Sequence, residues 1–399
     1  MSLELINRSQ DLKKLRDEGY EVEITNNGYL IISHVPCVSA KDTVFYGKLV
    51  SKLDLSGDVT VKPSDHVAFW AGEYPCDSKG SQLTRLVNNT GLNEKVRDGL
   101  VATISFSHKP GPQGYDDYYQ KMTSYIRILE AEARAIDSSV KSQTFAPVEL
   151  SEAESVFRYL DSASSRAGIV TINDKLKKGR IAIVGLGGTG AYILDLVSKT
   201  PVGEIHLFDG DNFLQHNAFR SPGAPSLDDL RKTPSKVAWF EANYSRMRRK
   251  IFAHPNFVDE TNITELKPMD FVFVCLDRGA PKKMILGYLL ENRIPFIDVG
   301  MDLFAESERL GGGARVSTYT PDYGDQLFKR INFTDGEDNL YSQNIQVADM
   351  NALNAALAVI RWKKLWGFYI DLQNEHNAIY GISTDTLTND EIPNEVAND

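Results

Sequence analysis

The sequence contains few cysteines, and they show no regular spacing. Of its 399 residues only Cys37, Cys76 and Cys275 are cysteine, and none belongs to a CxxC pair. This excludes a disulfide framework and a zinc site built from paired cysteines, so we expect no structural zinc. So little cysteine also fits a reducing compartment, and we expect a cytoplasmic protein.

Long apolar runs and an excess of basic charge are missing as well. The segment MSLELINRSQDLKKLRDEGY is charged throughout, and no later segment has the unbroken apolar length of a membrane span. We therefore expect a soluble protein that is not secreted and has no membrane partner. The formal net charge of −10 argues against general nucleic-acid binding, which needs clustered Lys and Arg. A small molecule or another protein is the expected partner.

The chain divides into two parts with different patterns. Residues 18–107 contain short apolar or alternating runs separated by Gly, Pro, Asn and Asp, and a helix follows them. Beyond residue 153 strands alternate with helices, which predicts βαβ units and a Rossmann-like, mainly parallel α/β sheet. We expect a smaller β-rich α+β accessory domain at 1–145, a linker at 146–152, the Rossmann-like domain at 153–382 and an acidic disordered tail at 383–399.

The second part gives the clearest element boundaries. Strands are expected at 180–185, 204–209, 270–277 and 295–300, with a later antiparallel strand at 313–321. Helices are expected at 152–165, 189–199, 235–247, 281–292 and 348–369.

A glycine-rich turn lies between the first of these strands and its helix, in IAIVGLGGTGAYILDLV. Gly185, Gly187 and Gly190 match G-x-G-x-x-G, and Gly188 adds a fourth glycine. In this context the pattern indicates a nucleotide whose phosphate lies at the helix N-terminus. Asp209 ends the next strand, nineteen residues beyond Gly190, where an acidic side chain binds a ribose hydroxyl. These features fit NAD and ATP equally well.

Polar residues further along the chain separate the two nucleotides. Asn217, Arg220 and Lys236 follow Asp209 closely, and a dehydrogenase has no need of them. Attack on the α-phosphate of ATP needs cations on the β- and γ-phosphates, which Arg220 and Lys236 can supply. Asp277, at the end of a later strand, can hold Mg²⁺. Each residue alone also fits a solvated surface charge or a helix cap.

Taken together, these residues resemble the adenylation domain of the ubiquitin-activating-enzyme-like family, which includes ThiF, MoeB and HesA. The resemblance runs from about residue 166 to residue 367. Asp209, Asn217 and Arg220 keep the spacing of the family motif D-x-D-x-V-x-x-S-N-L-x-R. Lys236 and Asp277 match the lysine and the magnesium-binding aspartate of the family.

The resemblance implies an ATP- and Mg²⁺-dependent adenylyltransferase. Its substrate would be the C-terminal carboxylate of a ubiquitin-like or sulfur-carrier protein, and pyrophosphate would leave. Asp209 would hold the ribose and Asp277 the Mg²⁺, while the glycine turn leaves room for the peptide tail. The phosphates would contact Asn217, Arg220 and Lys236. The family also implies a homodimer, in which Arg166 of one subunit enters the site of the other.

The fate of the adenylate is open from the sequence. It is released or passed directly to a partner, or an oxyester forms on Ser342, or Cys37 or Cys76 acts from the first domain. Four polar residues lie near these two cysteines in the chain, namely His34, His66, Glu73 and His108. Packing and turn roles are the simpler interpretation of that region, and Cys275, inside an apolar strand, is expected to be a core thiol.

The first domain resembles one that precedes adenylation domains in bacterial operons encoding ubiquitin-like proteins. Its aromatic segment GYDDYYQKMTSY fits a docking surface for the ubiquitin-like protein or a conjugating-enzyme-like partner, but equally a cover for the domain's own core. Two other functions stay open for the whole chain. One is an NAD(P)-dependent oxidoreductase, and the other is a non-catalytic scaffold that binds a ubiquitin-like protein.

Overall fold

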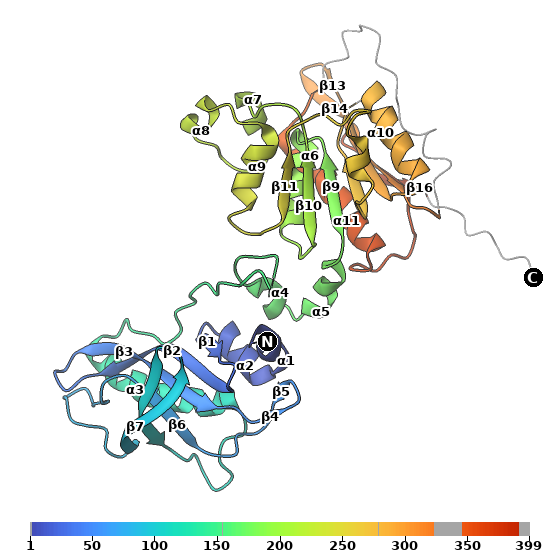
Figure 1. The fold of residues 1–399 in the computed structure, drawn as a ribbon. Helices are drawn as coiled ribbons and strands as arrows, with labels where there is room; N and C mark the ends of the chain where they lie inside the picture. The colour runs from blue at the N-terminus through green and yellow to red at the C-terminus, as the bar shows by residue number, and fades with distance from the viewer. Residues whose placement is uncertain (1, 154, 278, 323–344, 391–399) are drawn as a thin grey trace, which may run out of the picture. The chain divides into compact units, whose positions relative to one another are not determined.

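The computed structural model describes residues 2–153, 155–277, 279–322 and 345–390. The chain forms an N-terminal unit, residues 1–149 and 160–167, and a C-terminal unit, residues 150–159 and 168–399 (Figure 1). Each unit has its own hydrophobic core. Among the helices of the described residues, none has the length and apolar character that crossing a bilayer requires.

The N-terminal unit is built on one antiparallel sheet of strand order β1-β2-β3-β6-β8-β7. Its strands are β1 (Glu21–Ile24), β2 (Tyr29–Val38), β3 (Val44–Lys52), β6 (Val67–Ala71), β7 (Val87–Arg97) and β8 (Leu100–Ser107). Strands β4 (Leu55–Ser56) and β5 (Val59–Thr60) form a separate two-stranded hairpin between β3 and β6 in the chain. The helices are α1 (Ser2–Arg8), α2 (Gln10–Asp17), α3 (Tyr118–Ile136) and α4 (Ser162–Arg166). The prediction of a β-rich α+β unit is confirmed.

Helix α3 covers one face of this sheet and contacts β2 and β3 (Figure 1). It begins where the Asp117 carboxylate accepts a hydrogen bond from the backbone N–H of Gln120. Because its apolar residues recur every three or four positions, one side of the helix enters the core. Tyr115, Tyr118 and Tyr125 are all buried in that core. For these three rings the interpretation as a cover for the unit's own core is confirmed.

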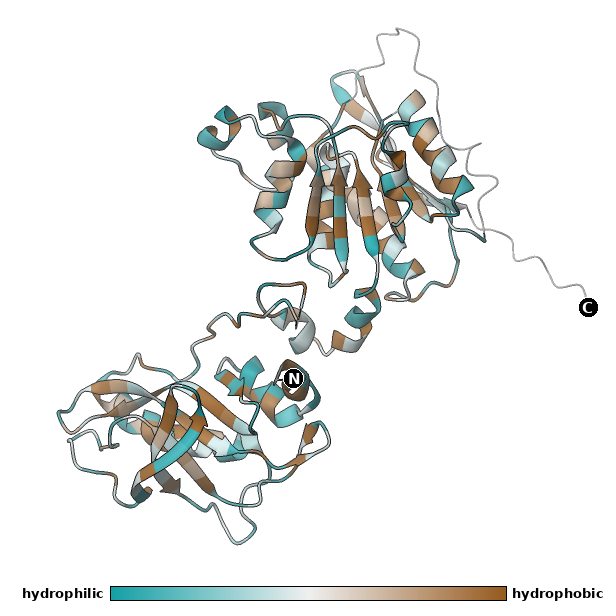
Figure 2. Cartoon of the chain, in the orientation of Figure 1, coloured by the Kyte–Doolittle hydropathy of each residue, from teal (hydrophilic) through white to brown (hydrophobic). Residues whose placement is uncertain are grey.

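The C-terminal unit contains a mixed sheet of strand order β11-β10-β9-β12-β13-β14-β15-β16, and Figure 2 shows its central strands as apolar. The parallel strands are β9 (Arg180–Val184), β10 (Glu204–Phe208), β11 (Ile251–His254), β12 (Phe271–Val274) and β13 (Phe296–Glu306). The antiparallel strands are β14 (Arg309–Tyr319), β15 (Asn377–Gly381) and β16 (Thr386–Asp390). The predicted Rossmann-like sheet, with a later antiparallel strand at β14, is confirmed.

Helices cover both faces of this sheet. One face packs against α6 (Gly188–Ser198), α9 (Lys236–Tyr244) and α11 (Ala348–Leu365). The other face packs against α10 (Ala280–Glu291) and the short η2 (Ile263–Leu266). The smaller helices are α5 (Val170–Asn173), η1 (Asp174–Leu176), α7 (Gln215–Ala218) and α8 (Leu227–Arg231). Strands covered on both faces explain the continuous apolar runs in the sequence.

The helix expected at 152–165 is wrong, apart from α4 at its end. The guanidinium of Arg249 donates hydrogen bonds of 2.7 Å to the carbonyls of Leu150 and Phe157. Phe157 also forms an isolated antiparallel bridge with Arg248. Because these backbone carbonyls accept hydrogen bonds from a distant part of the chain, they do not form the i to i+4 hydrogen bonds of a helix.

The acidic tail expected to be disordered at 383–399 is wrong for residues 386–390, which form β16. This strand pairs with β15 from Thr386 to Asp390. Its Thr-Leu-Thr sequence alternates polar and apolar side chains and suits an edge strand. Residues 391–399 lie outside the described residues.

Candidate functional site

The site predicted from the sequence lies at the carboxyl ends of β9, β10 and β12. β9 is flanked by β10 on one side and β12 on the other, so the strand order reverses at β9. Ligands of open α/β sheets bind at the carboxyl ends of the strands beside such a reversal. The glycine turn follows β9, and Asp209 and Asp277 follow β10 and β12.

The turn between β9 and α6 requires glycine for two separate reasons. Gly185 has φ +90°, and a Cβ there would lie 2.6 Å from the carbonyl oxygen of Cys275. A Cβ at Gly190 would lie 1.9 Å from the carbonyl oxygen of Gly185. At Gly187, which caps α6, a Cβ would meet no atom within 4 Å. The motif therefore packs helix against strand and leaves open space at the helix N-terminus, where anions bind.

Asp209 is buried and bonded to the glycine turn. Its Oδ2 accepts a 2.6 Å hydrogen bond from the backbone N–H of Leu186, and its Oδ1 accepts one of 2.9 Å from that of Asp211. The Lys236 ammonium lies 3.4 Å from Asp209 Oδ2 and 2.6 Å from Asp211 Oδ2. Lys236 begins α9 and is itself buried. The structure thus brings Asp209, Lys236 and the glycine turn together.

Asn217 lies in α7 and Arg220 lies two residues beyond its end, and each carries a buried hydrogen-bond donor. Asn217 Oδ1 accepts a 2.8 Å hydrogen bond from the backbone N–H of Leu214. Asn217 Nδ2 and Arg220 Nε, although buried, have no hydrogen-bond partner among the described residues. A buried donor left unsatisfied costs about 1–3 kcal/mol, so such groups call for an explanation, and a ligand is one.

Asn351 of α11 connects this segment to the glycine turn, and the sequence reasoning missed it. Its Nδ2 donates a 3.3 Å hydrogen bond to the carbonyl oxygen of Arg220. Its Oδ1 accepts one of 3.0 Å from the hydroxyl of Thr189 in α6. The available signal was a pair of asparagines, Asn351 and Asn354, three residues apart in an otherwise largely apolar helix. Both side chains are 0% exposed.

Asp277 lies three residues beyond the end of β12, and its side chain is exposed. Lys282, from α10, donates 3.2 Å hydrogen bonds to the carbonyl oxygens of Leu276 and Asp277. Its ammonium also lies 2.7 Å from the carboxylate of Asp298, which is 0% exposed. The sequence reasoning missed Lys282 and Asp298, which fix the backbone next to Asp277. An exposed carboxylate at this edge fits Mg²⁺, which commonly takes one or two protein carboxylates together with phosphates and water.

The three cysteines fit packing roles. Cys275 is partly buried against the core of the C-terminal unit, and burial together with nearby Asp298 raises the pKa of its thiol. Cys37 and Cys76 are buried in the N-terminal unit. Burial raises the pKa of Cys37 to about 12 and also raises that of Cys76. Thiols with raised pKa values are poor nucleophiles at neutral pH.

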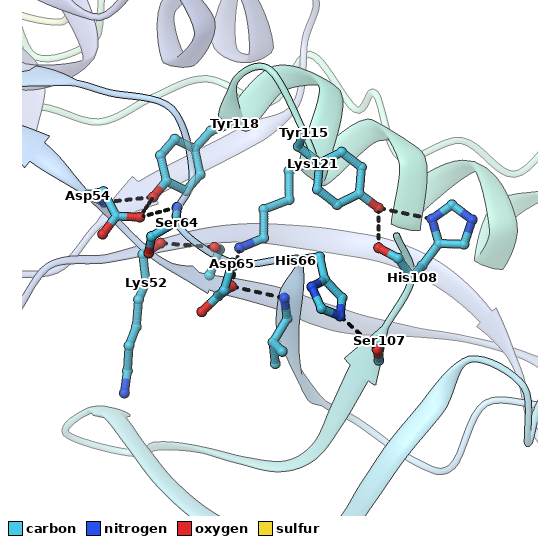
Figure 3. Close-up of polar contacts among 12 residues, drawn as sticks. Lys52, Asp54, Ser64, Asp65, His66, Ser107, His108, Tyr115, Tyr118 and Lys121 are labelled. Carbon is cyan, nitrogen blue, oxygen red and sulfur yellow. Dashed lines mark hydrogen bonds and ion pairs between the residues drawn. The ribbon is translucent and has the colours of Figure 1, made fainter. Parts of the chain in front are cut away.

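Two histidines of the N-terminal unit, His66 and His108, bond to hydroxyl groups of neighbouring elements (Figure 3). His66 Nε2 lies 3.1 Å from Ser107 Oγ, and His108 Nδ1 lies 2.9 Å from the Tyr115 hydroxyl. Within the described ranges no group of three or more His, Cys, Asp or Glu side chains could hold a metal ion. These contacts connect the start of β6, the end of β8 and the segment before α3. They therefore fit structural roles for His66 and His108.

Two further predicted residues are Arg166, which belongs to the N-terminal unit, and Ser342. Arg166 ends α4 in the N-terminal unit, where its Nη2 donates a 3.2 Å hydrogen bond to the carbonyl of Asp17. Its guanidinium also lies 5.8 Å from the centre of the Phe145 ring. Ser342 lies outside the described residues. The roles of both residues stay predictions.

The sheet order and the glycine turn define the C-terminal unit as a Rossmann-like α/β domain. Residues 162–333 match the ThiF family. Residues 10–162 match a domain of unknown function, DUF6791.

Curated relatives match only a part of the chain. "Ubiquitin-like modifier-activating enzyme 5" of Gallus gallus is 30% identical over 128 residues, which cover 29% of this chain and 32% of that protein. "tRNA threonylcarbamoyladenosine dehydratase" of Escherichia coli K12 is 24% identical over 122 residues, covering 30% of this chain and 45% of that protein. The chain thus matches less than half of the length of these relatives.

Solved structures of E. coli MccB resemble the chain at TM-scores below 0.5. The crystal structure with MccA-N7isoASN has a TM-score of 0.46 and 20% identity, and covers 58% of this chain and 69% of that chain. The crystal structure with ATP has a TM-score of 0.44 and 18% identity, and covers 57% of this chain and 71% of that chain.

Proposed function

We propose that the chain uses ATP to adenylate the C-terminal carboxylate of a ubiquitin-like or sulfur-carrier protein. One observation carries this proposal: the buried donors Asn217 Nδ2 and Arg220 Nε find no acceptor in the described part of the chain. Asn351 joins their segment to the N-terminus of α6. Donors and a helix N-terminus gathered in one place suit a polyphosphate.

The proposed reaction transfers AMP to the carboxylate. A carboxylate oxygen bonds to the α-phosphorus of ATP, the bond from that phosphorus to the bridging oxygen breaks, and pyrophosphate leaves with the electron pair. Negative charge gathers on the departing pyrophosphate, and Arg220 and Lys236 would stabilise it. Because Asp211, the nearer partner of Lys236, is exposed, its place can be taken by a phosphate oxygen.

The remaining predicted residues have proposed roles in holding ATP and Mg²⁺. Asp209 would accept a ribose hydroxyl, since a carboxylate offers about four lone-pair sites and this one already accepts three hydrogen bonds. Asp277 would hold Mg²⁺, which supplies positive charge next to the phosphates. The open space at Gly187 would admit the phosphates or the peptide tail.

The substrate class rests on the relatives and on the family resemblance. The activating-enzyme relative supports a protein carboxylate, and the matched ThiF-family domain supports the reaction type. Since burial raises the thiol pKa values of all three cysteines, we propose that the adenylate passes directly to a conjugating-enzyme-like partner.

The test is ATP–pyrophosphate exchange with a ubiquitin-like protein encoded beside this chain. Exchange should require that protein, and Arg220→Ala and Asp277→Ala should each lower it at least about a hundredfold. Arg231→Ala, an exposed arginine of α8, serves as the control and should exchange like the wild type. Saturable NAD(P) binding without exchange would favour the oxidoreductase, whereas protein binding without exchange would favour the scaffold.

A homodimer with Arg166 inserted into the partner's site is a separate part of this proposal. The test mixes two chains that are inactive alone, Arg166→Ala and Asp277→Ala. If each site takes Arg166 from the other subunit, mixed dimers contain one intact site and regain up to about half of the activity per dimer. No recovery in a mixture that forms mixed dimers would overturn the shared site and leave the adenylation proposal standing.

A further inference from the structure

Asn351 is a fully buried polar side chain that joins two separate segments of the candidate site. It belongs to α11, more than a hundred residues beyond Arg220 in the chain. Its amide accepts a hydrogen bond from Thr189 Oγ1 on α6 and donates one to the carbonyl oxygen of Arg220. Burial removes the amide of Asn351 from water, which costs free energy. The two hydrogen bonds compensate for this loss of hydration.

The contact with α6 is close as well as polar. A Cβ at Gly188 would lie 2.0 Å from Asn351 Nδ2, so the absence of a side chain there lets the amide lie against the first turn of the helix. Gly188 is therefore required by Asn351 rather than by the backbone turn, because its own φ is not positive. Gly188, the glycine of this turn that lies outside the G-x-G-x-x-G pattern, is thus explained by its contact with Asn351.

The segment held by Asn351 contains the unsatisfied donors. Asn217 accepts at its carbonyl from the backbone N–H of Arg220, at 3.1 Å, and from Ser221 Oγ, at 2.7 Å. These bonds make residues 217–221 a compact turn, and Asn351 holds this turn by the Arg220 carbonyl. Moving that carbonyl would shift the turn that carries the Arg220 side chain relative to α6, which Asn351 contacts through Thr189.

We infer that Asn351 is a positioning residue that fixes Arg220 relative to the N-terminus of α6, so that both contact the same polyphosphate. This inference rests on the proposed function and deepens it. Asparagine suits the role because one side chain offers both a donor and an acceptor. Aspartate would lose the donor to the Arg220 carbonyl and would add negative charge beside the phosphates.

The test compares Asn351→Ala with a matched control, Asn354→Ala. Asn354 lies one turn further along α11 and is equally buried, but its Nδ2 donates to the carbonyl oxygen of Gly300, at 3.0 Å. Asn351→Ala should weaken the binding of a non-hydrolysable ATP analogue about tenfold in calorimetry, as the loss of one buried interaction predicts. Asn354→Ala should change this affinity less than about twofold, since it does not contact the Arg220 segment.

A double-mutant cycle decides whether Asn351 acts through Arg220. In an Arg220→Ala background, Asn351→Ala should weaken analogue binding by less than about twofold more, because the group that it positions is already gone. Full additivity of the two effects would overturn the inference. Equal losses in Asn351→Ala and Asn354→Ala would also overturn it, since they would indicate general loosening of α11.

Amide hydrogen exchange of the protein without nucleotide gives an independent readout. Exchange in residues 217–222 should be faster in Asn351→Ala than in the wild type and unchanged in Asn354→Ala; equal rates in all three would contradict the inference. If the wild type binds no ATP analogue, the proposed function fails, and this measurement still decides whether Asn351 holds the segment. Should Asn351→Ala not fold, Thr189→Val removes the hydroxyl bonded to Asn351 with little change of shape and is expected to act in the same direction.

Discussion

The ammonium of Lys282 lies 2.7 Å from the carboxylate of Asp298, and both side chains are buried beside the backbone of Asp277. Arg315 completes this network with its Nη2 at 2.7 Å from the second carboxylate oxygen. A buried ion pair is costly to form but much more costly to break, because the remaining charge has lost both its hydration and its partner.

Replacing Lys282 with methionine should destabilise the C-terminal unit strongly. The change leaves Asp298 with one cation and removes the donor to the carbonyls of Leu276 and Asp277. We expect the free energy of unfolding to fall by about 3–5 kcal/mol in urea titrations. Lys283→Met, at the neighbouring exposed position of α10, is the control and should stay within about 0.5 kcal/mol of the wild type.

Replacing Gly190 with alanine should also destabilise this unit, although alanine usually favours a helix. The new Cβ would lie 1.9 Å from the carbonyl oxygen of Gly185, so α6 must move away from β9. We expect a loss of at least about 2 kcal/mol in the free energy of unfolding. Gly287→Ala in α10 is the control, because a Cβ there meets nothing within 4 Å. It should be neutral or stabilising by up to about 1 kcal/mol, and the same sign in both variants would contradict this account.

The sequence was sufficient to predict the parallel sheet because the patterns that indicate it are local. Strands β9 and β10 are followed directly by Gly185 and Asp209, and the glycine turn between β9 and α6 is itself encoded in the sequence. Such patterns depend on neighbouring residues alone, so they can be recognised without knowledge of the fold. Asp209 and Asp277 could be predicted as site residues for the same reason, because each follows the carboxyl end of a recognisable strand.

What the sequence could not predict depends on contacts between distant residues. The segment at 152–165 has a helical pattern, but Arg249, more than ninety residues away, bonds its carbonyl groups. From the sequence, Asn351 is one of two asparagines in a largely apolar helix, and its role follows only from the packing of α11 against α6, where its amide meets Thr189. Lys282 and Asp298 likewise become a pair only when α10 covers β13.

Removing the guanidinium of Arg249 should release the segment at 150–159 from the C-terminal unit. In the wild type Arg158 is held by its backbone N–H, which donates to the carbonyl of Met247, and by its Nε, bonded to the carbonyl of Ser245. Arg249→Ala should therefore make the bond after Arg158 more sensitive to trypsin, by about tenfold in initial rate. Arg246→Ala, an exposed neighbour, is the control. Unchanged cleavage in Arg249→Ala would mean that the other contacts suffice.

The stability of the C-terminal unit should fall as pH drops below about 6.5, in part because of His206. Burial lowers the pKa of His206, and the neighbouring His254 lowers it further, while Glu204 opposes the shift. Its Nδ1 lies 3.1 Å from His254 Nε2, and its ring stacks on Phe252.

The sign follows from the number of protons that each state binds. Above the unfolded pKa of about 6.5, His206 is neutral in both states and imposes no penalty. As pH falls below that value, the unfolded chain binds a proton more readily than the folded chain, so unfolding becomes easier. His206→Phe and His206→Asn should both reduce the drop in Tm between pH 8 and pH 5.5. The two variants should reduce this drop by similar amounts, because both remove the titratable imidazole. Their absolute Tm values are expected to differ, since phenylalanine and asparagine pack differently. The slope that remains includes His376, whose pKa burial also lowers. A drop as large as in the wild type in both variants would exclude His206 as a source of this pH dependence.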